Sequence, residues 1–123
     1  MKILVVDDEK DVELLFRQRF RKELRNNEVQ FAFAESGEKA LDYLDEHDYE
    51  ADSILSDINM PGMSGLQLLQ KIKQKKPAPT VMMITAYGDD ENHKEAMKLG
   101  ADEFLTKPLD FNLLKEKLKS INN

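Results

Sequence analysis

The sequence lacks cysteine and tryptophan and has only two histidines, His47 and His93. Without cysteine, the chain cannot form a disulfide, bind zinc through thiolates or use a cysteine nucleophile. The two histidines are far apart in the sequence and lack the spacing of paired metal ligands, so we expect both to face solvent on helices. Any metal bound by this chain should therefore be held by oxygen ligands.

Long apolar runs are also missing. The longest runs span four residues, as in Ile3–Val6 and Val81–Ile84. A membrane-spanning helix needs about 18 apolar residues, and a signal peptide needs an apolar stretch of about 7–15. We therefore expect a cytoplasmic chain without membrane contact. The net charge of −6, without a concentrated basic stripe, argues against direct binding of nucleic acid, which requires clustered Lys and Arg.

Short apolar runs alternate with amphipathic stretches along the 123 residues, a length typical of one domain. The predicted strands are Lys2–Asp7, Val29–Ala34, Ser53–Asp57, Thr80–Thr85 and Glu103–Thr106. The predicted helices are Glu9–Arg25, Glu38–His47, Gly65–Lys76, Glu91–Leu99 and a last helix that follows Asp110. We expect residues 1–123 to form a single domain.

This alternation predicts an α/β fold with a parallel sheet and helices on both of its faces. The second and fifth predicted strands are the best candidates for the sheet edges. The second alternates apolar and smaller or polar residues, and the fifth is short. The strand order is therefore predicted as 2-1-3-4-5, the flavodoxin-like doubly wound arrangement with five strands and five helices.

Polar side chains follow four of the predicted strands. Asp7 and Asp8 end the first strand, Asp57 the third, Thr85 the fourth, and Lys107 follows the fifth. In doubly wound folds the ligand site lies outside the carboxyl ends of the strands, so these groups should converge. Taken singly, the first acids could merely cap a helix and Asp57 could start a turn.

Clustered carboxylates repel one another, so we expect both a lysine and a divalent cation to neutralise them. Because oxygen ligands are the only ones on offer, Mg²⁺ suits the site best. A carboxylate in such a site can attack a phosphoryl group and form an aspartyl-phosphate. Metal, ammonium and hydroxyl groups then stabilise the charge on the transferred oxygens. The constellation thus predicts phosphoryl chemistry.

Four segments carry a resemblance to the receiver domains of two-component response regulators. They are Ile3–Glu9, Asp57–Gly65, Thr85–Ala86 and Gly100–Pro108. The resemblance covers essentially the whole chain, in order and at the family's spacing. It implies that Asp57 accepts a phosphoryl group. It also implies that Asp8, Asp57 and the backbone carbonyl of Asn59 bind Mg²⁺, with Asp7 acting through a bound water.

The resemblance also assigns the response to phosphorylation. Lys107 would pair with one phosphoryl oxygen and Thr85 would donate a hydrogen bond to another. Phe104 would be the switch aromatic that turns inward with Thr85, and the peptide bond before Pro108 would be cis. Tyr87, two residues past Thr85, is either loop filler or a gate over the site, and as a gate it should slow hydrolysis.

By the same resemblance the chain is a signalling domain and not an enzyme, apart from its own phosphotransfer and dephosphorylation. The implied partners are a sensor histidine kinase or histidine phosphotransfer protein and a downstream output domain or protein. The responsive surface would comprise the fourth and fifth helices and the fifth strand. A homodimer through that surface is left open.

Three alternatives remain open at this point. A haloacid-dehalogenase-type phosphohydrolase also uses Mg²⁺ and an Asp nucleophile, but it carries a second Asp two residues later, where this chain has Asn59. A flavodoxin-like redox module needs a phosphate loop after the first strand, where the acids Asp7, Asp8 and Glu9 would repel the cofactor. A domain with the same fold that only binds partners would not be phosphorylated at all.

Overall fold

The computed structural model describes residues 1–86 and 88–121. Its strands are β1 (Lys2–Val6), β2 (Gln30–Ala34), β3 (Ser53–Asp57), β4 (Thr80–Ala86) and β5 (Glu103–Lys107). Its helices are α1 (Val12–Arg19), α2 (Arg21–Arg25), α3 (Gly37–Glu46), α4 (Gly65–Lys73), α5 (Asp90–Lys98) and α6 (Phe111–Ile121).

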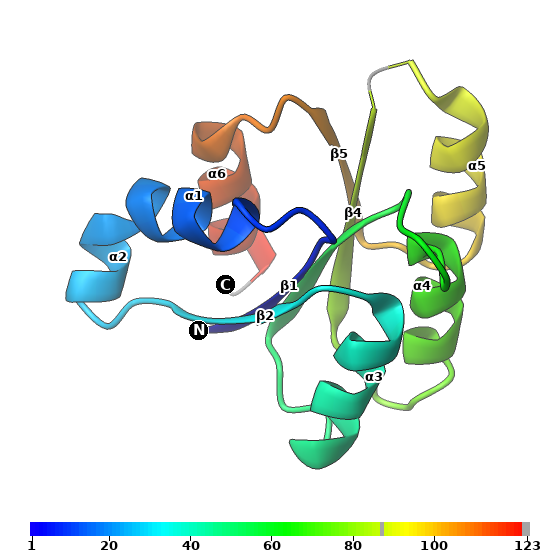
Figure 1. Ribbon diagram of the computed structural model, residues 1–123, viewed down its shortest axis with the longest axis horizontal. Helices are drawn as coiled ribbons and strands as arrows, with labels where there is room; N and C mark the ends of the chain where they lie inside the picture. The colour runs from blue at the N-terminus through cyan, green and yellow to red at the C-terminus, as the bar shows by residue number, and fades with distance from the viewer. Residues whose placement is uncertain (87, 122–123) are drawn as a thin grey trace.

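The five strands form one parallel sheet in the order β2-β1-β3-β4-β5. The sheet is the middle of three layers: α1 and α6 lie on one side, and α3, α4 and α5 lie on the other (Figure 1). The predicted doubly wound α/β fold and its strand order are confirmed. Because all strands run in one direction, their carboxyl ends share one edge of the sheet.

The prediction of one helix over Glu9–Arg25 is wrong. The chain enters α1 only at Val12 and leaves the helical conformation at Phe20, where φ is −108° and ψ is 22°. The ring of Phe20 is buried and lies 5.0 Å from Phe31 between ring centroids. No glycine or proline marks this break, so periodicity alone could not separate α1 from α2. Residues 1–86 and 88–121 therefore contain six helices.

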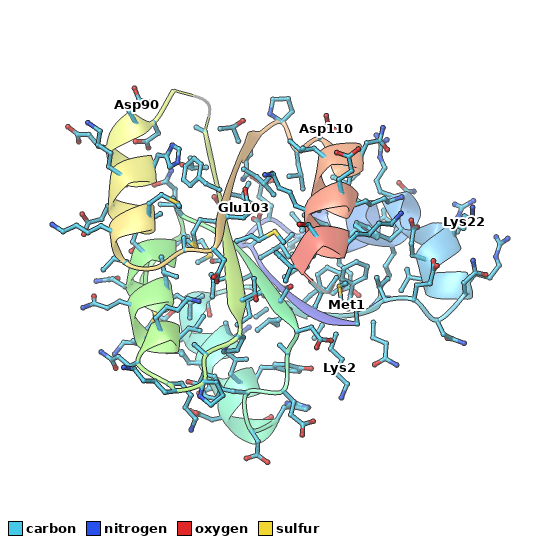
Figure 2. All side chains as sticks on the ribbon, turned by 180° about the vertical axis from the view of Figure 1, so that it is seen from behind. Met1, Lys2, Lys22, Asp90, Glu103 and Asp110 are labelled. Atoms are coloured by element: carbon cyan, nitrogen blue, oxygen red, sulfur yellow. The ribbon has the colours of Figure 1, made fainter. Side chains whose placement is uncertain are left out.

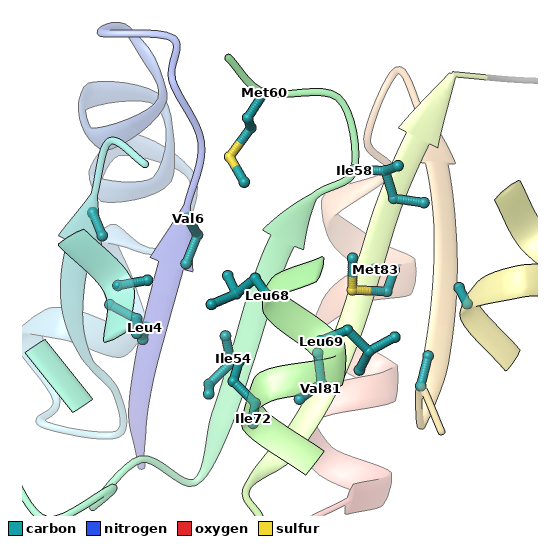
Figure 3. Close-up of a cluster of buried hydrophobic side chains, with 14 of the residues drawn as sticks. Leu4, Val6, Ile54, Ile58, Met60, Leu68, Leu69, Ile72, Val81 and Met83 are labelled. Atoms are coloured by element: carbon teal, nitrogen blue, oxygen red, sulfur yellow. The ribbon is translucent and has the colours of Figure 1, made fainter. Parts of the chain in front are cut away.

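Two hydrophobic clusters fill the spaces on either side of the sheet. Alternate residues of β1 divide between them: Leu4 and Val6 face α3, α4 and α5, whereas Ile3 and Val5 face α1 and α6. Figure 3 shows the first cluster, in which side chains of β1, β3 and β4 meet those of α4. Strands apolar on both faces are what a sheet covered on both sides requires.

Serine side chains cap the starts of two helices. Ser36 accepts a hydrogen bond from the backbone N–H of Lys39, and Ser64 forms a capping box with Gln67. In α4, Leu66 is half-buried, whereas Leu68 is fully buried.

The methionines of the chain differ in how deeply they are buried. Met82 and Met83 are fully buried in β4 and Met60 is 9% exposed. Met63 is half-buried, and Met97 is 47% exposed on α5. The packing of α5 buries Ala96 completely and leaves the adjacent Met97 outside the contact with the sheet.

Gly65 allows the start of α4 to approach the end of β3 closely. Its backbone N–H donates a hydrogen bond to the carbonyl oxygen of Ile58 over 2.8 Å. A Cβ atom at position 65 would lie 2.7 Å from the Cα of Ile58 and closer still to the carbonyl oxygen of Asp57. Both neighbours are backbone atoms, so the contact cannot be relieved by a side-chain rotation.

We therefore predict that Gly65→Ala destabilises the protein, although alanine is the better helix former. Overpacking of this kind costs about 1–3 kcal/mol, which urea denaturation followed by circular dichroism would measure. Gln70→Ala on the exposed side of α4 is the matched control and should leave the free energy of unfolding nearly unchanged. Equal stability of Gly65→Ala and wild type would contradict the close approach.

Candidate functional site

The acidic site lies at the carboxyl edge of the sheet. Asp57 is the last residue of β3, and Asp7 and Asp8 directly follow β1. One carboxylate oxygen from each of these three residues lies within 4.8 Å of the other two. In Figure 2, Asp90 at the start of α5 and Asp110 before α6 mark this edge, while Met1 and Lys2 mark the opposite one. The predicted convergence of distant acids is thus present in the fold.

Lys107, the last residue of β5, reaches into the cluster. Its Nζ donates a hydrogen bond to Oδ2 of Asp57 at 3.1 Å. The same Nζ lies 3.8 Å from Oδ2 of Asp7 and 3.9 Å from Oε1 of Glu9. The side chain of Asp57 is 8% exposed and that of Lys107 is 37% exposed, so solvent is excluded from the carboxylate but still reaches the lysine.

Sequence reasoning missed Glu9 as a neighbour of this lysine. Glu9 follows directly on Asp7 and Asp8, so the acidic run itself was the signal. The structure also overturns the capping interpretation of these acids, because α1 starts three residues after Glu9, at Val12. Oδ1 of Asp7 instead accepts a hydrogen bond from the backbone N–H of Glu9 at 2.9 Å. This contact orients Asp7 toward the cluster.

Burial and charge act on the site in opposite directions. Burial raises the pKa of Asp7 above its usual range. The hydrogen bond from the Glu9 N–H and the charge of Lys107 lower this pKa, whereas the negative charges of Asp57 and Glu9 raise it further. Burial alone would lower the pKa of Lys107, but its hydrogen bond to Asp57 and the surrounding carboxylates raise that pKa. Lys107 therefore remains an ammonium group at neutral pH.

Thr85 lies on β4 next to Ile84, which pairs with Asp57 in the sheet register. It is completely buried, and its Oγ1 has no hydrogen-bond partner within residues 1–86 and 88–121. A buried hydroxyl without a partner costs free energy, typically about 1–3 kcal/mol. This hydroxyl lies near the carboxyl edge, one residue after Ile84, the partner of Asp57 in the sheet.

The remaining predicted site residues are less enclosed. Asn59 is exposed two residues after Asp57, and Phe104 is half-buried in β5. The peptide bond between Lys107 and Pro108 is cis. Tyr87, predicted as a gate, lies outside the described residues.

The residues of the cluster fit Mg²⁺. Every side-chain ligand that they offer is a carboxylate oxygen, which is the ligand type that Mg²⁺ prefers. The cluster contains the carboxylates of Asp7, Asp8 and Asp57, and the ammonium group of Lys107 pairs with Asp57. One ammonium group cannot neutralise three carboxylates, so a net negative charge remains that a cation would offset.

Comparison with known proteins gives a consistent result. The chain matches the response regulator receiver domain family over residues 3–119. It is 36% identical over 96% of its length to a cyclic di-GMP phosphodiesterase of Thermotoga maritima, of which it spans 30%. It is 34% identical over 98% of its length to response regulator RppA of Synechocystis, of which it spans 50%. The chain thus covers half or less of each of these relatives.

Solved structures agree with these matches. A response regulator receiver domain protein from Clostridium thermocellum superposes with a TM-score of 0.85 at 31% identity, covering 98% of this chain and 92% of that one. Response regulator TrrA from Thermotoga maritima, solved in complex with Mg²⁺ and BeF, gives a TM-score of 0.77 at 34% identity, covering 98% and 97%. No helix in the described part of the chain has the length and apolar character needed to cross a membrane. The chain belongs to the family of response regulator receiver domains.

Proposed function

We propose that this receiver domain is a phosphorylation-dependent signalling switch in which Asp57 accepts the phosphoryl group. The donor would be a phosphohistidine of a sensor histidine kinase or of a histidine phosphotransfer protein. The observation that carries the proposal is the position of the Asp57 carboxylate, which shares one small space with Asp7 and Asp8 and faces Lys107 at 3.1 Å.

Asp8, Asp57 and the backbone carbonyl of Asn59 would hold Mg²⁺, with Asp7 contributing through a water. The bound ion offsets the charge of the carboxylates, so that an anionic phosphoryl donor can approach Asp57. The carboxylate of Asp57 attacks phosphorus as the bond from phosphorus to the histidine nitrogen of the donor breaks. Asp57 is buried, and this favours transfer from a docked donor over reaction with water.

Lys107 acts by charge. In the structure its ammonium group donates a hydrogen bond to Oδ2 of Asp57. The hydrogen bond and the surrounding carboxylates raise the pKa of Lys107, so the group stays positively charged. After transfer it can pair with a phosphoryl oxygen without moving far. The lysine thus stabilises both the free and the phosphorylated site.

The predicted fourth and fifth helices are α5 and α6, because α1 and α2 stand where one helix was predicted. Thr85 and Phe104 would pass the change to the surface formed by α5, β5 and α6. A phosphoryl oxygen would accept the hydrogen bond that the buried hydroxyl of Thr85 lacks among the described residues. Displacement of Thr85 would then allow Phe104 to turn inward, as the family resemblance implies. Output partners would recognise the altered surface.

Asp57→Asn should abolish phosphorylation. Incubation of wild type with acetyl phosphate and Mg²⁺ should add the mass of one phosphoryl group, because the carboxylate is the nucleophile. Intact-protein mass spectrometry measures this directly. Asp42→Asn, on the exposed side of α3, removes a carboxylate of the same type away from the site and should be labelled like wild type. Equal labelling of the Asp57→Asn protein would refute the assignment.

Asp8→Ala should remove the stabilisation that Mg²⁺ gives. In a chelator the variant should melt at or above the wild-type temperature, because the mutation removes repulsion among three carboxylates. Saturating Mg²⁺ should then raise the melting temperature of wild type but not of the variant. Asp11→Ala is the matched control, since Asp11 makes no side-chain capping hydrogen bond. A wild-type response to Mg²⁺ in Asp8→Ala would exclude Asp8 as a ligand.

Thr85→Val should separate stability from signalling. Removing a buried, unpartnered hydroxyl should stabilise the unphosphorylated protein by about 1 kcal/mol, while the response of Phe104 to beryllofluoride should be lost. Amide spectra with and without beryllofluoride measure that response. Ser53→Ala is the matched control, because Oγ of Ser53 is also buried without a partner in the described chain. Ser53 is the first residue of β3, at the end of that strand away from Asp57. Ser53→Ala should respond as wild type does; a normal response in Thr85→Val would sink the proposed coupling.

A further inference from the structure

His93 does more than face solvent on α5, because its imidazole lies flat against the ring of Phe104. The two ring centroids are 4.1 Å apart and the planes differ by 9°. We propose that His93 is a positioning residue that holds Phe104 in the position seen here and so opposes the inward turn of this ring. This inference rests on the proposed function and deepens it.

The register of the sheet places the groups involved on one face. Met83 of β4 pairs with Phe104 of β5, and Thr85 pairs with Thr106. Side chains alternate along a strand, so those of Thr85 and Phe104 point to the same side. Met83 and Phe104 belong to the cluster that packs against α3, α4 and α5. The unpartnered hydroxyl and the aromatic ring therefore share the space beneath α5, the helix that carries His93.

The first turn of α5 fixes the backbone from which His93 projects. Asp89 precedes this helix, and its Oδ1 accepts a hydrogen bond from the backbone N–H of Asn92 at 3.2 Å. The backbone N–H of His93 donates to the carbonyl oxygen of Asp89, also at 3.2 Å. The imidazole is thus presented from an ordered, capped helix end and not from a loop.

One side of this stack borders open space at the surface. A surface hollow of about 540 Å³ is lined by residues of the segment before α5, of α5 itself, of β5 and of α6. His93, Phe104 and Leu113 belong to its wall. Phe104 is therefore not locked by surrounding protein on all sides, and the contact with His93 is a specific restraint on its position.

A contact made in one of two conformations shifts the equilibrium between them. The stack with His93 is present only while Phe104 keeps its present position, so it opposes the inward turn. A ligand that binds only the turned state has a lower apparent affinity when that state is less populated. Loss of a stack between two aromatic rings should raise that affinity roughly two- to tenfold.

The test compares His93→Ala with His93→Phe, which keeps a ring at this position. Titration with beryllofluoride in the presence of Mg²⁺, followed by amide spectra, should give a two- to tenfold tighter response for His93→Ala. His93→Phe should stay close to wild type. His47→Ala is the matched control. His47, at the C-terminal end of α3, stacks on Tyr43 of the same helix with ring centroids 4.0 Å apart. Its loss should leave the affinity unchanged.

A second measurement does not depend on phosphorylation. Side-chain couplings of Phe104 in the protein without beryllofluoride should report a single χ1 rotamer in wild type and His93→Phe, and a mixture in His93→Ala. An unchanged rotamer in His93→Ala would overturn the proposal, as would equal affinities for beryllofluoride in both His93 variants. If wild type itself bound no beryllofluoride, the proposed function would fail, while the rotamer measurement would still decide the role of His93.

Discussion

The charge balance at the carboxyl edge of the sheet is the constraint on which the rest of the site depends. Three carboxylates converge there, and the only ammonium group that contacts them in the described chain is Lys107. Repulsion between Asp7 and Asp57 is part of what raises the pKa of Asp7, and attraction holds Lys107 against Asp57. A site with this excess of negative charge is suited to a divalent cation and, with it, to a phosphoryl group.

The sheet connects this charge to the surface. Asp57 and Thr85 lie on neighbouring strands, and Phe104 lies on the next strand at the face covered by α5. The core beneath them is densely apolar, so small shifts at the edge are not absorbed by polar rearrangement. The half-buried ring of Phe104 borders a surface hollow and stacks on His93. In the proposed switch, a charge added at the carboxyl edge would be read as a change of shape on this face.

Local patterns predicted much of this structure because each depends on near neighbours in the chain. The capping residue Ser36, the capping box at Ser64 and the five buried or edge strands follow from such patterns. The break at Phe20 does not, since it depends on burying one ring among aromatic side chains of β2 and α6. The exposure of Met97 likewise depends on how α5 packs, and not on its own sequence.

By itself the sequence determined the fold class, the strand order and the set of acids that would meet, because parallel strands bring their carboxyl ends to one edge. Only the tertiary structure decided how these groups interact. It placed Lys107 against Asp57 and near Glu9, left the hydroxyl of Thr85 buried without a partner among the described residues, and stacked His93 on Phe104. Each of these contacts joins segments far apart in the chain or on different elements, and their distances are set by the packing of helices on the sheet.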